Sequence, residues 1–417
     1  MMFEKIPAWL RWALYAFVGV LVLTVVQGFD DTESLTSIGS AQSMLRWAVP
    51  ILLAGLGGLF SERAGVVNIG LEGMMILGTW FGAWGAVTYG AWWGLTLGVL
   101  GGAMGGLLHA IATVTFGVDH IISGVAVNIL APGIARFLSS EIFTTIEGGS
   151  ITQSPRVPGV GNVTIPFLAG GNIGTWQSPD LLGWLGQTEL FLVSDLANLA
   201  KGLVTRISWV SLIALLLVPA TAWLLWRTRF GLRLRICGER PQAGEAQGIN
   251  VYRYKYIGVV ISGALAGLAG AFIASPELSG IYLEGQTTGR GFIGMAALIF
   301  GNWRPWGVLG GALLFGYPFG IGLRDLDGAA SHSLILVNAL GLGAVAVWAA
   351  TRGKRSDAIL AAVLGLGAAV WYFTSDTLPD VVISVLPFVI VLLVLIFFAQ
   401  RLRPPAADGL PYRKGEH

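Results

Sequence analysis

The sequence predicts an all-α integral membrane protein that crosses the bilayer many times, and three observations support this fold class. Hydrophobic residues make up 54% of the 417 residues, and charged residues make up only 12%. A soluble domain is typically about 45–50% apolar and about 25% charged. Apolar runs of about 20 residues, the length needed to cross the hydrocarbon core, recur along the chain. The chain also has 60 glycines, roughly twice the usual share.

We expect about 11 or 12 transmembrane helices. Their ranges are 8–28, 42–60, 67–89, 92–116, 121–140, 207–226, 256–275, 291–300, 306–323, 331–350, 357–373 and 380–398. The eighth range is short, and a full span there would have to begin near Ile281 and include Glu284 and Arg290. We expect an irregular or broken outer end, because non-helical backbone at membrane depth is tolerated only when protein shields it or it lines a wet cavity.

Glycines recur four residues apart on single faces of the predicted helices. Examples are Gly98, Gly102 and Gly106 in the fourth span, and Gly263 and Gly267 in the seventh. Such stripes of small residues let membrane helices approach closely. We therefore expect most of them to hold helices together rather than to line a path.

The distribution of basic residues predicts the orientation of the chain. Short loops that remain in the cytoplasm carry an excess of Lys and Arg. Counting alternate spans places the basic loop 227–255, the loop TRGKR at 351–355 and the arginines after residue 400 on one side. We therefore predict that both termini are cytoplasmic, and seven isolated basic residues on the outer side are exceptions to this bias.

The sequence carries no recognisable catalytic or metal-binding pattern. It has no Gly-rich phosphate loop of the GxxxxGK(S/T) kind, so we do not expect the chain to hydrolyse ATP itself. The four histidines and the single cysteine are scattered, which gives no metal-ligand cluster and no disulfide framework. These observations favour a transport protein without a cofactor over an enzyme.

Polar side chains inside the predicted spans are the candidates for a translocation path. A carboxylate at mid-membrane costs roughly 2.5–3.5 kcal/mol on insertion scales, so it marks a buried partner or a wet path. Glu72, near the inner end of the third span, fits either role equally well. Asn68 beside it and Asn128 in the fifth span slightly favour hydrogen bonds between helices. All three remain candidates for the path.

Two further polar residues are weaker candidates. His109 lies near the inner end of the fourth span, and we expect it to be a packing residue with satisfied hydrogen bonds. Asn338 lies in the tenth span. Acidic pairs or chains in consecutive spans are absent, although proton- or sodium-coupled carriers usually show such relays. An ion-coupled secondary transporter is therefore the less favoured alternative.

The segment 226–256 is the longest polar, basic stretch between two apolar runs. Its middle predicts a short helix, because Pro241 suits the first turn and Gly248 suits the exit. A short surface helix in such a loop has the shape of a docking element. On charge alone, an ordinary solvated loop that sets the orientation is equally good.

The sequence of this loop, FGLRLRICGERPQAGEAQGINVYRYKY, resembles the coupling loop of ABC importer permeases of the branched-chain amino acid, simple sugar and nucleoside group. Four other segments look like the same family: LLAGLGGLFSERAGVVNIGLEGMMILGTWFGAW, VDHIISGVAVNILAPG, GRGFIGMAALIFGNWRPWG and LPYRKGE. The resemblance implies the helical ABC importer permease fold. It also implies that Glu239 to Gly248 is the coupling helix, which the ATPase grips, and that it includes Glu239, Pro241, Ala243, Ala246 and Gly248.

The resemblance further implies the assembly and its substrate. It implies two ATP-binding subunits on the cytoplasmic side, a second related permease subunit or a self-dimer, and a substrate-binding lipoprotein outside a bacterial inner membrane. A nucleoside is the favoured solute, and a simple sugar or a branched-chain amino acid is the alternative. A scaffold or a membrane-embedded enzyme is the least favoured class.

The map divides the chain into six regions. They are an N-terminal helix with an outer loop (1–41), the first core helices (42–140), a long periplasmic segment (141–206), core helices with the coupling loop 227–255 (207–323), an extra helix pair (324–377), and the last helix with a cytoplasmic tail (378–417). Members of the family are usually shorter, and the extra pair and the long outer segment are the departures. Their roles stay open.

Overall fold

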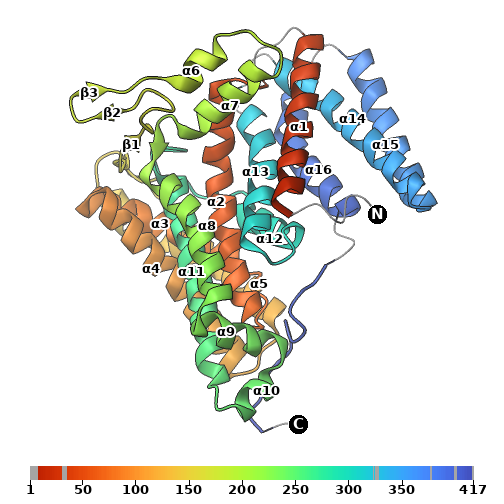
Figure 1. Ribbon diagram of the computed structural model, residues 1–417. Coiled ribbons are helices and arrows are strands. Elements are labelled where there is room, and N and C mark those ends of the chain that lie inside the picture. Colours follow the sequence, from red (N-terminus) through yellow and green to blue (C-terminus); the bar gives the residue numbers. More distant parts are fainter. Residues whose placement is uncertain are drawn as a thin grey trace. The chain divides into compact units, whose positions relative to one another are not determined.

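The computed structural model describes residues 8–30, 35–322, 324, 328–375, 378–398 and 402–415, and these residues are mostly helical (Figure 1). The helices are α1 (Ala8–Asp30), α2 (Ile38–Arg63), α3 (Leu71–Tyr89), α4 (Ala91–Ala110), the π-helix η2 (Ile111–Thr115), α5 (His120–Ile142), the 3₁₀-helix η3 (Phe143–Thr145), α6 (Leu181–Gly186), α7 (Val193–Val204), α8 (Trp209–Arg227), α9 (Arg229–Glu239), α10 (Pro241–Ala246), α11 (Val251–Ala274), α12 (Arg290–Phe300), α13 (Pro305–Gly322), α14 (Ala329–Thr351), α15 (Arg355–Thr374) and α16 (Asp380–Phe398). The strands are β1 (Asn162–Val163), β2 (Asn172–Ile173), β3 (Trp176–Gln177) and β4 (Ile207–Ser208).

A helix lies on each of the twelve ranges expected from the sequence. Among the described residues, seven helical segments are long and apolar enough to cross a membrane. They are Ile38–Arg63, Ala91–Thr115, His120–Thr145, Trp209–Arg227, Val251–Ala274, Ala329–Thr351 and Arg355–Thr374. The predicted all-α, multi-pass fold is confirmed, while the total of 11 or 12 spans and the side of each terminus stay predictions.

The described residues form two compact units. Unit 1 comprises residues 1–45, 162–207 and 317–397, and unit 2 comprises residues 46–161, 208–316 and 398–417, apart from those outside the described ranges. Three of the boundaries fall within helices, namely α2, α13 and the last residue of α16. Unit 2 holds Asn68, Glu72, Asn128 and the predicted coupling helix, so the candidate functional site is built from this unit.

Glycine contacts hold together the centre of unit 2, where α3, α4 and α11 pack against one another (Figure 1). A Cβ added at Gly102 on α4 would lie only 2.2 Å from the carbonyl oxygen of Gly263 on α11. One added at Gly78 on α3 would lie 2.2 Å from the carbonyl oxygen of Gly267. The backbones touch at these points, so the glycine stripes hold helices together as the sequence analysis expected.

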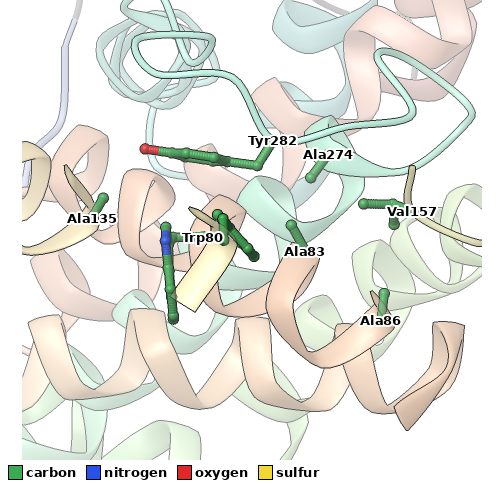
Figure 2. Packing of buried hydrophobic residues seen from close by; sticks show 8 residues of the cluster. Trp80, Ala83, Ala86, Ala135, Val157, Ala274 and Tyr282 are labelled. Atoms are coloured by element: carbon green, nitrogen blue, oxygen red, sulfur yellow. The ribbon is translucent and has the colours of Figure 1, made fainter. Parts of the chain in front are cut away.

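An aromatic cluster closes one end of this helix packing (Figure 2). Trp80 of α3 and Tyr282 of the irregular stretch after α11 are both buried there, together with small side chains such as Ala135 and Ala274. The indole of Trp80 donates a hydrogen bond to the hydroxyl of Ser139, at an N···O distance of 2.9 Å. The stretch 275–289 between α11 and α12 contains no helix, which is the broken end expected before the eighth span.

Unit 1 contains α1, α14, α15 and α16, which pack through small apolar clusters. Asp30 at the end of α1 accepts hydrogen bonds from Ser333 of α14 and Tyr372 of α15. The part of segment 141–206 in this unit contains the β2–β3 hairpin, α6 and α7. Helix α7 has 12 residues, fewer than the roughly 20 needed to span a bilayer. A polar depression of about 700 Å³ lies beside α7, lined by Asp195, Gln27 and neighbouring residues.

Candidate functional site

The carboxylate of Glu72 holds the start of α12. Glu72 lies in the first turn of α3, where its Oε1 accepts a hydrogen bond from the Gly289 amide at 2.8 Å, and its Oε2 accepts one from the Gly291 amide at 2.7 Å. The first amides of a helix have no partner within the helix, and negative charge is favourable there. Glycine is required at position 291, because a Cβ there would lie 2.6 Å from the Glu72 amide nitrogen.

Asn128 joins α5 to the start of α3. Its Nδ2 donates to the carbonyl of Ile69 at 3.0 Å, and its Oδ1 accepts from the amide of Gly73 at 2.7 Å. Asn128 thus satisfies backbone groups on both sides of the point where α3 begins. The half-buried side chain lies on the only partly buried helix α5.

Asn68 and His109 hold the irregular segment 64–70 that precedes α3. Asn68 is fully buried and donates from Nδ2 to the hydroxyl of Ser262 on α11 at 2.8 Å. The two ring nitrogens of His109 contact the hydroxyl of Ser123 at 2.8 Å and the carbonyl of Val67 at 3.0 Å. His109 therefore has satisfied hydrogen bonds, as expected for a packing residue.

We call the set Asn68, Glu72, Asn128, Gly289 and Gly291 the midspan junction. Helix α12 has 11 residues and is about 16 Å long, and its far end contacts the last residues of α2. Its start therefore lies about one helix length, roughly 16 Å, from the turn that contacts α2. Glu72 lies in the first turn of α3, which begins at Leu71 after an irregular stretch, and its predicted place near the inner end of the span stays a prediction.

The fourth polar candidate does not join this set. Asn338 lies on α14 in unit 1, and its Nδ2 donates at 2.7 Å to the carbonyl of Leu334, one turn earlier on the same helix. The structure thus brings Asn68, Glu72 and Asn128 together. It shows their contacts within the chain, and a role in the path stays a proposal.

The predicted short helix is present as α10, with Pro241 at its first position and Gly248 beyond its end at a φ of +76°. Only glycine adopts such a left-handed conformation readily. Ala243, Ala246 and Gly248 are exposed, whereas Pro241 is buried. The outward side of α10 thus presents small residues beside the exposed Gln242 and Gln247, and another protein surface can approach it closely at the small residues.

The sequence analysis missed one helix in this loop. Glu239 does not belong to α10, because it is the last residue of α9. The hydroxyl of Thr228 accepts a hydrogen bond from the Gly231 amide at 3.1 Å and caps the start of α9. A threonine before a helix is a typical N-terminal signal, and it could have revealed α9.

The C-terminal residues 402–415 lie on α9 and α10 (Figure 1). The amide of Ala407 donates to the carbonyl of Gly238 at 2.8 Å, and the amide of Ala406 donates to Glu239 at 3.2 Å. The hydroxyl of Tyr412 donates to the carboxylate of Glu245 at 2.6 Å. The motif LPYRKGE stood out in the sequence, but nothing in the sequence indicated that it packs on the predicted coupling helix.

Charged groups gather where these residues meet the end of α2, and Glu62 is buried among them. We call Glu62, Arg63, Glu239, Trp303 and Asp408 the α10 joint. The carboxyl groups of Glu62 and Asp408 lie close enough to influence each other's ionisation. Burial and the neighbouring Glu62 carboxylate raise the pKa of Asp408 to about 9.

The neighbouring cation and thiol are also buried. Lys255 donates from Nζ to the carbonyl of Gly65 at 2.9 Å. Burial raises the pKa of the Cys237 thiol to about 11, so the thiol stays protonated and unreactive at neutral pH. Within the described ranges, no group of three or more His, Cys, Asp or Glu side chains could hold a metal ion.

Comparisons with known proteins agree with this architecture. The family model described as "Branched-chain amino acid transport system / permease component" matches residues 40–324. The guanosine ABC transporter permease protein NupQ of Bacillus subtilis is 31% identical over 89% of this chain and 95% of its own length. The nucleoside ABC transporter permease protein NupC of Lactococcus lactis is 36% identical over 66% of this chain and 78% of its own length.

A third relative carries a different substrate in its name. The putative glucose ABC transporter permease protein TsgC13 of Haloferax volcanii is 33% identical over 69% of this chain and 78% of its own length. No solved structure matches the chain significantly. The family match covers more than half of the chain, and the apolar helices agree with it. The chain therefore belongs to the permease component family of branched-chain amino acid transport systems, and it is a multi-pass protein of the cytoplasmic membrane.

Proposed function

We propose that this chain is a permease subunit of an ATP-driven importer for nucleosides. Members of its family are permease components without an ATPase site of their own, and they work with ATP-binding and substrate-binding partners. The names of NupQ and NupC support a nucleoside as the solute. In this proposal two permease subunits enclose the path, and two ATP-binding subunits supply the energy.

The observation that carries the coupling role is the exposed face of α10. Ala243, Ala246 and Gly248 are exposed at the tip of a basic loop, and the helix is held in place from behind by residues 402–415. We place this loop and both termini on the cytoplasmic side, where ATP is available. Closure of the ATP-binding subunits would push on α10 and expose the path alternately to each side of the membrane.

The midspan junction is the proposed lining of the path. We place its polar groups within the membrane, where a neutral polar solute needs hydrogen-bond partners. Asn128 is the best candidate for direct contact, since its side chain is only half-buried within this subunit. Glu72 and Asn68 are buried and would act by holding the backbone around it.

The coupling role can be tested by placing a large charged side chain on the exposed face of α10. We expect Ala243→Arg to lose uptake and the association with the ATP-binding subunit, because the added side chain prevents close approach. The measurement is nucleoside uptake and copurification of the ATP-binding subunit. The matched control is Ser356→Arg, at an exposed position in the first turn of α15. Normal uptake by Ala243→Arg would contradict the coupling role.

The substrate needs its own experiment. Purified substrate-binding partner should be titrated with guanosine, uridine, ribose, glucose and leucine, and uptake of each should be measured with the whole complex. We expect nucleosides to compete best. Preferential uptake of glucose or ribose would favour the sugar alternative, for which the likeness to TsgC13 is the specific observation.

A further inference from the structure

Helix α12 connects the midspan junction to the α10 joint. Its first amides are held by the carboxylate of Glu72, and the turn after its last residue is held by Glu62 and Arg63. A helix of 11 residues is about 16 Å long and stiff over that length. One rigid element thus has a polar attachment at each end, and the two attachments involve different parts of unit 2.

The attachment after the last residue of α12 is a chain of contacts that begins at α9. Arg63 forms an ion pair with Glu239 at 3.4 Å and donates to the carbonyl of Trp303 at 2.8 Å. The indole of Trp303 donates in turn to the carboxylate of Glu62. The end of α9 is therefore linked through one arginine to the turn that follows α12.

The turn after α12 is held in an unfavourable conformation. Asn302 and Trp303 have φ values of +52° and +54°, a left-handed region that bulky residues rarely adopt. Such conformations persist only when surrounding contacts hold them. Besides the contacts of Trp303, the amide of Arg403 donates to the Asn302 side chain at 2.8 Å. The C-terminal residues therefore help to hold the turn as well as α9.

Close backbone packing prevents α12 from tilting alone. A Cβ added at Gly294 would lie 3.0 Å from the amide nitrogen of Gly55 on α2. One added at Gly55 would lie 2.9 Å from the carbonyl oxygen of Gly294. Packed elements of this kind move as rigid bodies rather than by continuous deformation. A displacement of the turn at Trp303 is therefore passed to Glu72 at the other end.

We propose that α12 is a rigid link that transmits the movement of α9 and α10 to the midspan junction, with Arg63 and Trp303 as its positioning residues. The inference rests on the proposed function, because the movement would come from the ATP-binding subunits. It identifies the residues outside α10 on which coupling depends. It also gives Glu72 a mechanical role in place of direct contact with the solute.

The test measures how much nucleoside is imported per ATP hydrolysed by the reconstituted complex. We expect Trp303→Phe, which removes the indole donor but keeps an aromatic ring at this buried position, to lower this ratio about tenfold, within the usual range for coupling between sites. Glu72→Gln, at the other end of α12, should lower it similarly. Trp306→Phe is the matched control, since Trp306 is an exposed tryptophan three residues further on. ATP hydrolysis and assembly should persist in all three variants.

A second variant guards against simple misfolding. Glu239 is about half-exposed, so Glu239→Gln weakens its ion pair with Arg63 without disturbing the packed interior. Arg304→Gln is its matched control, an exposed arginine in the same turn as Trp303. We expect Glu239→Gln to lower the ratio and Arg304→Gln to leave it unchanged.

The two proposals can fail separately. A complex of the unmodified chain that hydrolyses ATP but imports no nucleoside, sugar or amino acid would overturn the proposed function. An unmodified complex that imports normally, together with unchanged ratios for Trp303→Phe, Glu72→Gln and Glu239→Gln, would overturn the rigid link alone. A loss of ATP hydrolysis in step with uptake would also contradict it, because a broken link should uncouple the two.

Discussion

The centre of unit 2 and the helix pair α14–α15 of unit 1 are both apolar, yet they are built differently. In α11 of unit 2, 72% of the most apolar stretch is buried within the subunit, whereas in α15 the share is 17%. Helices α3, α4 and α11 touch through backbone at glycines such as Gly102 and Gly267. The glycines Gly341 of α14 and Gly367 of α15 have open space around them.

Exposed apolar side chains characterise the helix pair α14–α15. Val347 of α14 and Val363 and Leu366 of α15 are each more than 60% exposed in this subunit. Lipid tails are as apolar as these side chains, so a membrane helix can leave them on its surface at little cost. The comparison teaches that apolar character places a helix in the membrane, while close glycine contacts and cross-helix hydrogen bonds determine which helices form the rigid part.

The largest expected effect comes from crowding the central helices. Gly267→Leu would add a large side chain where even a Cβ atom would lie only 2.2 Å from the carbonyl oxygen of Gly98. We expect it to destabilise the subunit by roughly 3 kcal/mol or more, at the upper end for overpacked interiors. The measurement is thermal unfolding of the purified subunit in detergent, together with the yield of monodisperse protein.

Gly341→Leu makes the same change in the helix pair. A Cβ at Gly341 meets no atom within 4 Å, so the new side chain has room, and we expect the midpoint of unfolding to move little. Equal losses in the two variants would show that the helix pair is as tightly packed as the centre of unit 2, and the comparison would fail.

This contrast also marks how far sequence reasoning extends. Apolar run length predicted a helix on every expected range, and the four-residue spacing of Gly98, Gly102 and Gly106 predicted a contact stripe. The spacing does not tell which glycine stripe packs against which, because this depends on how the helices are aligned in three dimensions. The sequence also could not place Glu72 at the start of α12, because Glu72 is 217 positions before Gly289 and 219 positions before Gly291.

The predicted coupling helix shows the same limit at closer range. Pro241 and Gly248 indicated the ends of α10 because their backbone preferences are local. The contacts of residues 402–415 with α9 and α10 depend on long-range hydrogen bonds through amides such as those of Ala406 and Ala407. Backbone amides are the same in every residue except proline, so no residue type signals such a contact.

A smaller effect on stability is expected from replacing Asn128 and Asn338, two asparagines that differ in their hydrogen-bond partners. Asn128→Ala leaves the carbonyl of Ile69 and the amide of Gly73 without their side-chain partner, and we expect a loss of about 1–2 kcal/mol. Asn338→Ala removes one hydrogen bond to Leu334 of the same helix, where the backbone bond remains, so the loss should be below about 0.5 kcal/mol. Unfolding in detergent compares both with the unmodified chain. A larger loss for Asn338→Ala would reverse the argument that cross-helix polar contacts distinguish the centre of unit 2.

The smallest effect is that of pH on the docking of residues 402–415. The prediction compares a buried carboxyl pair in unit 2 with an exposed ion pair in unit 1. Burial and the neighbouring Glu62 raise the pKa of Asp408 from 3.8 to about 9, so docking of residues 402–415 is coupled to uptake of a proton. The contribution of Asp408 to docking is fully present below pH 4 and is lost progressively as the pH rises toward 9. Arg63 and Lys255 lie nearby and oppose this loss by stabilising the ionised form.

The rate of trypsin cleavage after Arg413 and Lys414 reports release of the C-terminal residues. We expect cleavage of the unmodified chain to accelerate between pH 7 and pH 9.5 relative to Asp408→Asn, which stays neutral and corrects for the pH dependence of the protease itself. Asp357→Asn should change nothing, because Asp357 and Lys354 form an exposed pair at 3.6 Å that solvent screens. Identical pH profiles for the unmodified chain and Asp408→Asn would show that protonation of Asp408 does not hold the C-terminal residues, and their attachment would then depend on the hydrogen bonds of Ala406, Ala407 and Tyr412.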